Sequence, residues 1–413
     1  MQQPGGAAGS GSAPFGAGPH AGPHAGPLRG LRVLEVATLY SAPQVGALLG
    51  DLGADVVKVE QRGGDPMRAM GQHRDGRAVA WELVARNKRS IVLDLDDAAT
   101  DVRADRATDR DVFTRLVGAA DVLVENLTPA VRTRWGCTYE QLAAHNPRLV
   151  VVSVSCYGLT GPYADRPGAG TLAEAFAGLT HMTGEPDGPP MLSSVAVGDT
   201  VTAFWGVIGA LAACWGRDAG RGGDTEPRGR LVDVSMVEPM LHVMAGTIAG
   251  WDREGAPPIR SGSRVPGGVP RNVYRTADDK YVAVSGTTDA QVGRVLGMLG
   301  RVDAASRDRF GTAAARRTSG DELDALVAAW IAARPRDDVV ASFVGARVPI
   351  SPVNDARDVL GDPQVRVRGA VVEPGPAPGL DAHHDEVLAD WIDGSGSDGS
   401  GSDGSGTESG SRE

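Results

Sequence analysis

The side chains that could form a covalent bond to a substrate carbonyl flank the apolar runs of this chain. Cys156 follows the run at residues 149–154, and Asp199 precedes the run at residues 201–215. A thiolate and a carboxylate both act as nucleophiles when their surroundings activate them. No base accompanies Cys156 in the sequence, which favours a packed small side chain there. Asp199 is also well placed to cap the helix that the second run predicts.

The first half of the chain alternates β-rich runs with helical segments. Residues 31–37 and 54–60 are β-rich, and residues 42–53 between them have helical spacing, a proline near the start and a glycine at the end. This strand–helix–strand unit predicts a parallel α/β sheet. Further strands are predicted at residues 90–95, 121–125 and 149–154. Ligands bind beyond the carboxyl ends of such strands, so the residues directly after each strand are candidate site residues.

The second half is predicted to contain a buried helix and a second domain. Residues 201–215 are apolar and rich in Gly and Ala, and the run is too short to cross a membrane. The polar, glycine-rich residues 217–229 suggest a domain boundary. Strands at residues 231–235 and 281–285 and mainly helical residues 288–332 follow. The segments at residues 349–353 and 362–368 suggest that the chain then returns to the first domain.

Composition indicates an acidic protein with low-complexity ends. Residues 1–27 are rich in Gly, Ala and Pro, and residues 393–413 repeat Gly and Ser, so both tails are predicted to be disordered. The net charge is −11; the second tail carries five acidic residues and one arginine, which leaves −7 for the body. This charge disfavours nucleic-acid binding.

The three cysteines have no metal-ligand spacing, so no metal site is expected. They favour free thiols in a reducing compartment. The N-terminal residues lack the pattern of a signal peptide, and we expect a cytoplasmic protein without a membrane contact.

Several motifs, in order along the chain, resemble those of the class III CoA-transferases (the CaiB/BaiF family). Relatives of that family include formyl-CoA:oxalate and carnitine CoA-transferases and α-methylacyl-CoA racemase. The motifs stand at residues 53–60, 64–68, 87–94, 121–126, 146–150, 158–175 and 183–190. The resemblance implies an α/β fold with a Rossmann-like large domain, a small α+β domain, and a ring-like chain in an interlocked homodimer. It places the large domain at residues 28–216 and 331–392 and the small domain at residues 231–330.

The same resemblance implies a binding site for a coenzyme A thioester, which would be a substrate and not a permanently bound cofactor. Such a site needs cations and backbone donors for the phosphates. By position, the family's CoA contacts correspond to Tyr40, Ser41, Ala85, Asn87, Lys88, Asn126, Leu127, Arg134, Ser155 and Tyr157. Lys88 and Arg134 are the expected cations. Gln61 replaces a family arginine, and the neighbouring Arg62 is expected to substitute for it.

The expected nucleophile is absent at its usual position. The transferases have an aspartate where this chain has Gly170, and the racemases have a His-Asp pair where it has Ala169-Gly170. Two carboxylates remain as catalytic candidates. Glu174 follows Gly170 by one helical turn, which places both on one face of a helix. Asp199 matches an acid/base residue of the racemase branch. Polar support of the site for Glu174 and helix capping for Asp199 are the alternatives.

Three functions remain open from the sequence. The leading hypothesis is a CoA-transferase that moves CoA from an acyl-CoA to a small carboxylic acid, with Glu174 or Asp199 replacing the usual aspartate. The first alternative is racemisation or isomerisation of an acyl-CoA with Asp199 as the base. The second is an acyl-CoA-binding protein that has lost catalysis, because Gly170 cannot act as a nucleophile.

Overall fold

The computed structural model describes residues 26–96, 108–220, 228–255, 257–265, 268–371 and 376–394. Most of both predicted tails therefore lies outside the described residues. The described chain forms two compact units. The large unit comprises residues 26–167, 200–235 and 376–394, and the small unit comprises residues 168–199 and 236–371.

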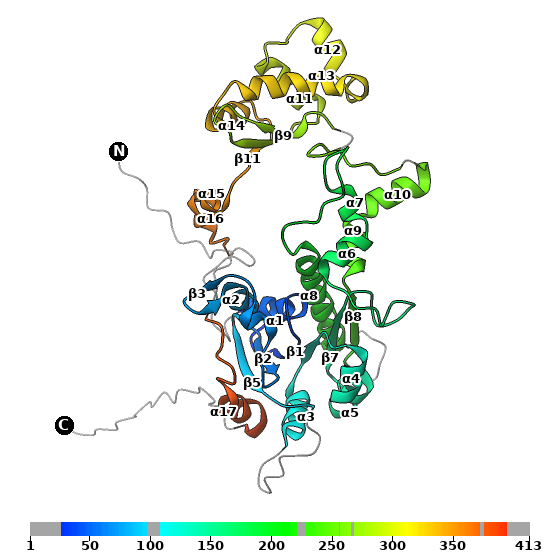
Figure 1. Ribbon diagram of the computed structural model, residues 1–413, viewed down its shortest axis with the longest axis vertical. Helices are drawn as coiled ribbons and strands as arrows, with labels where there is room; N and C mark the ends of the chain where they lie inside the picture. The colour runs from blue at the N-terminus through cyan, green and yellow to red at the C-terminus, as the bar shows by residue number, and fades with distance from the viewer. Residues whose placement is uncertain are drawn as a thin grey trace, which may run out of the picture. The chain divides into compact units, whose positions relative to one another are not determined.

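A six-stranded parallel sheet forms the centre of the large unit (Figure 1), in the order β5-β2-β1-β6-β7-β8. Its strands are β1 (Arg32–Val36), β2 (Asp55–Glu60), β5 (Lys88–Val92), β6 (Val122–Glu125), β7 (Val150–Ser155) and β8 (Leu231–Ser235). All five neighbouring pairs are parallel. The predicted α/β fold with a parallel sheet is confirmed. The sheet places its ligand-binding edge at the carboxyl ends of these strands.

Helices cover both faces of this sheet. On one face, Leu34, Val57 and Leu123 share a core with Phe113 of α3 (Asp109–Ala119) and with Trp391 near the end of the described chain. The other face carries α1 (Ser41–Asp51) and α8 (Val197–Asp218). The remaining helices of this unit are α2 (Val79–Ala85), α4 (Pro129–Trp135), α5 (Tyr139–His145) and α17 (His384–Val387), with η1 (Pro66–Ala69), η2 (Leu388–Asp393) and the hairpin β3–β4 (His73–Arg74, Arg77–Ala78).

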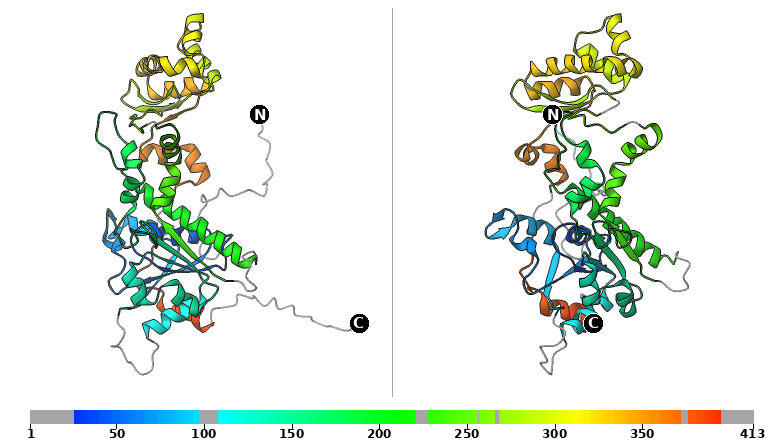
Figure 2. Two further views of the ribbon diagram at one scale, coloured as in Figure 1. Left: turned by 90° about the vertical axis from the view of Figure 1, so that its right-hand side faces the viewer. Right: turned by 45° about the vertical axis from the view of Figure 1, so that its right-hand side comes forward.

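Helix α8 is longer than its apolar run predicts. It has 22 residues and is, within the described ranges, the one helix whose length and composition would allow it to cross a membrane. Core helices of soluble proteins meet the same test, and α8 packs on the sheet (Figure 2). At Gly206 an added Cβ would lie 2.8 Å from a methyl group of Val45. The absence of a side chain at this position therefore allows α8 to approach α1 closely.

The small unit contains a three-stranded antiparallel sheet in the order β11-β10-β9. Its strands are β9 (Arg271–Arg275), β10 (Tyr281–Ser285) and β11 (Ile350–Pro352), and the helices that pack on them are α11 (Asp289–Met298), α12 (Ala304–Phe310), α13 (Ala313–Ala332) and α14 (Arg336–Gly345). The other helices of this unit are α6 (Gly170–Phe176), α7 (Leu179–Met182), α9 (Val237–Val243), α10 (Ala245–Glu254), α15 (Ala356–Gly361) and α16 (Pro363–Arg368).

The unit boundaries differ from those expected at three places. Residues 168–199, expected in the large domain, belong to the small unit. Residues 231–235 form β8 in the large sheet, where Val232 and Val234 lie in register with Val152 and Val154 of β7. Residues 350–352 form β11 in the small sheet because they pair with β10. The segment at residues 362–368 is helical. The chain therefore returns to the large unit after residue 371 and not at residue 331.

Two buried lysines share one buried carboxylate in the large unit. Glu35 accepts hydrogen bonds from Lys58 Nζ at 2.8 Å and from Lys88 Nζ at 2.6 Å, and all three side chains are fully buried. Burial alone would lower the pKa of Lys58, but Glu35 and Asp65 raise it above its usual value. Burial lowers the pKa of Lys88 to about 8 despite Glu35. A Cβ at Gly46 of α1 would overlap Glu35 Oε2, so the carboxylate also requires this glycine.

Replacing Glu35 by glutamine tests the importance of this cluster. We expect the free energy of unfolding to fall by about 3–5 kcal/mol, because both ammonium groups lose their shared buried counter-ion. Urea denaturation measures the difference. Glu140→Gln, which removes an exposed carboxylate from the first turn of α5, is the control. Equal stabilities of the two variants would contradict the assignment.

Candidate functional site

Gly170 is the first residue of α6, and it is buried. A Cβ built on Gly170 would lie 2.5 Å from Asp199 Cγ, closer still to Asp199 Oδ2, and 2.8 Å from the Asp199 backbone nitrogen. Carbon atoms do not approach each other so closely without a bond. The Asp199 carboxyl group therefore occupies the space that a side chain at position 170 would enter.

Asp199 lies within the first turn of α8. Capping was the alternative role expected from the sequence, but α8 begins at Val197, so Asp199 is the third residue of the helix and not its N-cap. Burial, and after it the negative charge of Glu174, raise the pKa of Asp199. A carboxylate whose pKa is raised is more basic than an exposed aspartate.

Glu174 lies on the same α6 helix as Gly170, one turn later, and is 1% exposed. One carboxylate oxygen accepts a hydrogen bond from the Gly198 backbone N–H at 2.9 Å, and the other accepts one from the Ser193 hydroxyl. Glu174 thus connects α6 to the residue that precedes Asp199. The sequence did not point to Ser193, because a single polar residue in a loop carries no signal of its partner.

Three pairs of the predicted CoA contacts lie at the carboxyl ends of adjacent strands in the large unit. Tyr40 and Ser41 follow β1, Asn126 and Leu127 follow β6, and Ser155 ends β7 with Tyr157 two residues later. The side chain of Asn126 joins two of these loops: it accepts a hydrogen bond from the Thr38 N–H at 3.0 Å and donates one to the Thr38 carbonyl at 2.8 Å. The sheet therefore brings these six residues to one edge.

The predicted contacts at residues 85–88 lie elsewhere. Ala85 is buried at the end of α2, Asn87 donates a hydrogen bond to Asp51 at 2.8 Å, and Lys88 begins β5 with its ammonium group buried against Glu35. In this structure Lys88 does not present its charge to a phosphate, contrary to the expectation. Its position before an apolar strand gave no indication that Glu35 lies inside the unit to receive it.

The other two predicted cations are on the surface. Arg134 in α4 is 52% exposed and pairs with Asp96 at 2.6 Å, and Arg62 is 69% exposed and pairs with Asp94 at 2.9 Å. Surface ion pairs of this kind contribute little to stability, so either guanidinium could exchange its partner for a phosphate.

Arg166 is a cation near β7 that the sequence did not single out. Its guanidinium carbon lies 4.9 Å from the centre of the Tyr163 ring and 5.8 Å from that of Tyr157. The rings hold the exposed guanidinium in place by cation–π attraction. An arginine fixed in this way suits a carboxylate or a phosphate. Only the folded arrangement reveals the two tyrosines as its neighbours.

Cys156 is buried, as expected for a packed thiol. Among the described residues, no group of three or more His, Cys, Asp and Glu side chains is arranged to hold a metal ion.

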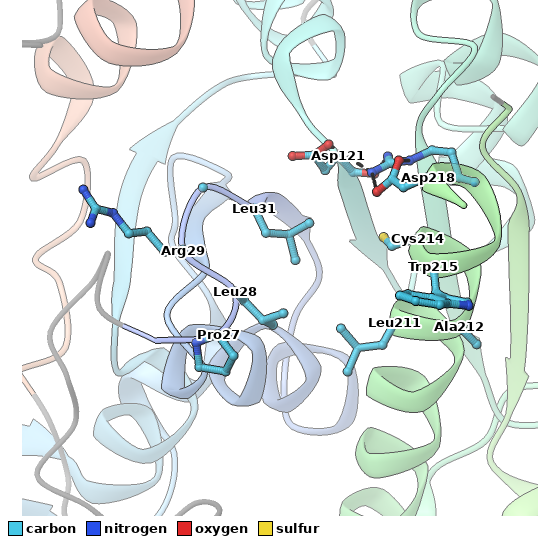
Figure 3. A pocket seen from close by; sticks show the side chains of 12 residues that line it. Pro27, Leu28, Arg29, Leu31, Asp121, Leu211, Ala212, Cys214, Trp215 and Asp218 are labelled. Carbon is cyan, nitrogen blue, oxygen red and sulfur yellow. Dashed lines mark hydrogen bonds and ion pairs between the residues drawn. The ribbon is translucent and has the colours of Figure 1, made fainter. Parts of the chain in front are cut away.

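A pocket of about 720 Å³ lies on a different part of the large unit (Figure 3). Leu28 and Leu31 line one side, and Leu211 and Trp215 of α8 line the other. Leu31 precedes β1 and Asp121 precedes β6, so the pocket adjoins the amino ends of these strands. It is therefore at the opposite edge of the sheet from Tyr40, Asn126 and Ser155.

Known proteins resemble this chain over most of its length. Residues 28–383 match the sequence profile of CoA-transferase family III. The succinyl-CoA–D-citramalate CoA-transferase of Chloroflexus aurantiacus is 35% identical over 344 residues, which cover 83% of this chain and 82% of the relative. The succinate–glutarate CoA-transferase of Agrobacterium fabrum is 34% identical over 356 residues, which cover 84% of each.

A solved structure shows the same fold. The crystal structure of a CaiB/BaiF family protein from Brucella suis is 30% identical and aligns with a TM-score of 0.75 over 89% of this chain and 99% of that chain. The chain therefore belongs to CoA-transferase family III.

Proposed function

We propose that this CoA-transferase uses the Asp199 carboxylate as its nucleophile in place of a carboxylate at position 170. The observation that carries the proposal is the overlap between Asp199 and any side chain at position 170. The chain has lost the usual aspartate, but the structure supports a carboxylate in the same small volume. The raised pKa of Asp199 also supports the proposal, because a more basic carboxylate is a better nucleophile.

In the proposed reaction, Asp199 Oδ attacks the carbonyl carbon of the acyl-CoA, the carbon–sulfur bond breaks, and CoA thiolate leaves a mixed anhydride on the enzyme. The thiolate then attacks the aspartyl carbonyl of the anhydride, which releases the first acid as a carboxylate and leaves an aspartyl-CoA thioester. The acceptor carboxylate attacks this thioester and again expels CoA thiolate. The thiolate finally attacks the acceptor's acyl carbon, forming the new acyl-CoA and restoring Asp199.

We further propose that succinyl-CoA is the donor and that a short dicarboxylic acid is the acceptor. The relatives named above are a succinyl-CoA–D-citramalate CoA-transferase and a succinate–glutarate CoA-transferase, and a further one, 33% identical, is a succinyl-CoA:mesaconate CoA-transferase of Haloarcula marismortui. The exposed guanidinium groups of Arg134 and Arg166 support the binding of anionic substrates in the large unit.

A homodimer and a cytoplasmic location, both expected from the sequence, complete the proposal. Exposed apolar side chains on α9 and α10 of the small unit, among them Val243, Ile248 and Trp251, support an interface with a second copy. Sedimentation of the purified protein would test the dimer.

Asp199→Asn tests the nucleophile. We expect the rate of CoA transfer from succinyl-CoA to glutarate to fall by about 10⁴-fold, because removal of a reacting side chain lowers enzyme rates on this scale. The initial rates are measured by separating the two acyl-CoA products. Asp187→Asn, which changes an exposed aspartate of the same unit, should keep the full rate. If Asp199→Asn also keeps it, Asp199 is not the nucleophile.

The same assay separates the alternative functions when it is run in deuterated water. Uptake of deuterium at the α-carbon of an acyl-CoA without exchange of CoA would indicate isomerase chemistry with Asp199 as a base. Binding of acyl-CoA without either reaction would indicate a protein that has lost catalysis.

Gly170→Ala tests whether the Asp199 carboxyl group needs the space beside position 170. The added Cβ would displace the Asp199 carboxyl group, and a displacement of about 1 Å is enough to cost roughly 10²-fold in rate. The control is Gly293→Ala in α11, where an added Cβ meets nothing within 4 Å. We expect the control to keep its rate. Equal rates for the two variants would show that position 170 does not constrain Asp199.

A further inference from the structure

We propose that Glu174 is a positioning residue that holds the first turn of α8 in place and puts a fixed negative charge beside Asp199. This inference rests on the proposed function of Asp199. It assigns Glu174 no bond to the substrate and no place in the covalent sequence.

The contacts of Glu174 favour a positioning role over nucleophilic attack on the thioester. Both of its carboxylate oxygens accept hydrogen bonds, one from the Gly198 N–H at 2.9 Å and one from the Ser193 hydroxyl. Its side chain is almost completely buried. In an attack on a thioester, the reacting oxygen of Glu174 would give up its bond to the buried Gly198 N–H or to the half-buried Ser193 hydroxyl.

The bond to Gly198 fixes Asp199 through one peptide unit. Gly198 lies so close to α6 that an added Cβ would be 2.5 Å from the Gly170 carbonyl oxygen and 3.2 Å from Glu174 Cγ. Glycine at positions 170 and 198 therefore allows the starts of α6 and α8 to meet. Glu174 then sets the distance between them, because its backbone is part of α6 and its carboxylate holds α8.

The negative charge of Glu174 acts on Asp199 in a way that the neutral amide of a glutamine would not. A glutamine could accept from the Gly198 N–H and also bond to Ser193, so the geometry alone does not require a carboxylate. Burial, and after it the negative charge of Glu174, raises the pKa of Asp199. The other titratable side chains on the helices that pack on α6 are His181 of α7 and Glu238 and His242 of α9.

Two substitutions separate the positional role of Glu174 from its charge. Glu174→Gln keeps the hydrogen bonds and removes the charge, so kcat/KM on its pH plateau should stay within about tenfold of the wild type, the cost of one modest polar interaction. Glu174→Asp keeps the charge but shortens the side chain, so Asp199 is displaced and kcat/KM should fall by about 10²-fold.

The pH profile of kcat/KM distinguishes the charge of Glu174 from a purely structural role, which would leave the profile unchanged. Activity needs ionised Asp199 and is lost as the pH falls through its pKa. Removal of the neighbouring negative charge lowers this pKa, so the acid limb of kcat/KM should move to lower pH in Glu174→Gln and should move less in Glu174→Asp, which keeps a negative charge. Glu238→Gln in α9 is the matched control, and its profile should equal that of the wild type.

Each possible outcome decides between the proposals. If Asp199→Asn is inactive but the acid limb of Glu174→Gln does not move, the charge role is wrong while the nucleophile assignment stands. A full plateau rate in Glu174→Asp contradicts the positional role, even if Glu174→Gln does not fold. An active Asp199→Asn contradicts the proposed function itself.

Discussion

A side chain at position 170 and the present position of Asp199 exclude each other, because an added Cβ would lie 2.5 Å from Asp199 Cγ. This close approach depends on the backbones of α6 and α8, which meet at Gly170 and Gly198. The absence of a side chain at position 170 therefore does not leave an empty space in the site. It is the condition under which the Asp199 carboxyl group of α8 can occupy the same volume.

The chain treats its buried charges in two different ways. In the large unit, Glu35 lies between Lys58 and Lys88, so each buried ammonium group is paired with a carboxylate. In the small unit, Glu174 and Asp199 have the same charge, and Glu174 contributes to the raised pKa of Asp199. Opposite charges stabilise a folded structure, whereas neighbouring like charges shift a protonation equilibrium and are typical of functional sites. The like-charged neighbour of Asp199 supports the catalytic role proposed for it.

The sequence predicted the fold well where local patterns determine it. Apolar runs separated by helical segments predicted the parallel sheet, and motif order predicted the family. Local patterns could not show that residues 231–235 pair with β7, because pairing depends on a distant strand. They also could not show that Lys88 points to Glu35, 53 residues earlier in the chain. Glu174 and Asp199 were both candidates in the sequence. The roles proposed for them rest on the space at Gly170 and on the hydrogen bonds to Gly198 and Ser193, which only the folded chain brings together.

The position of the covalent intermediate tests the central claim most directly. The protein is incubated with succinyl-CoA without an acceptor acid, digested at low pH, and searched by mass spectrometry for peptides that carry CoA in thioester linkage. The account predicts the adduct on Asp199, and its absence when Asp199 is asparagine. A CoA thioester on Glu174 or on any other carboxylate would contradict it.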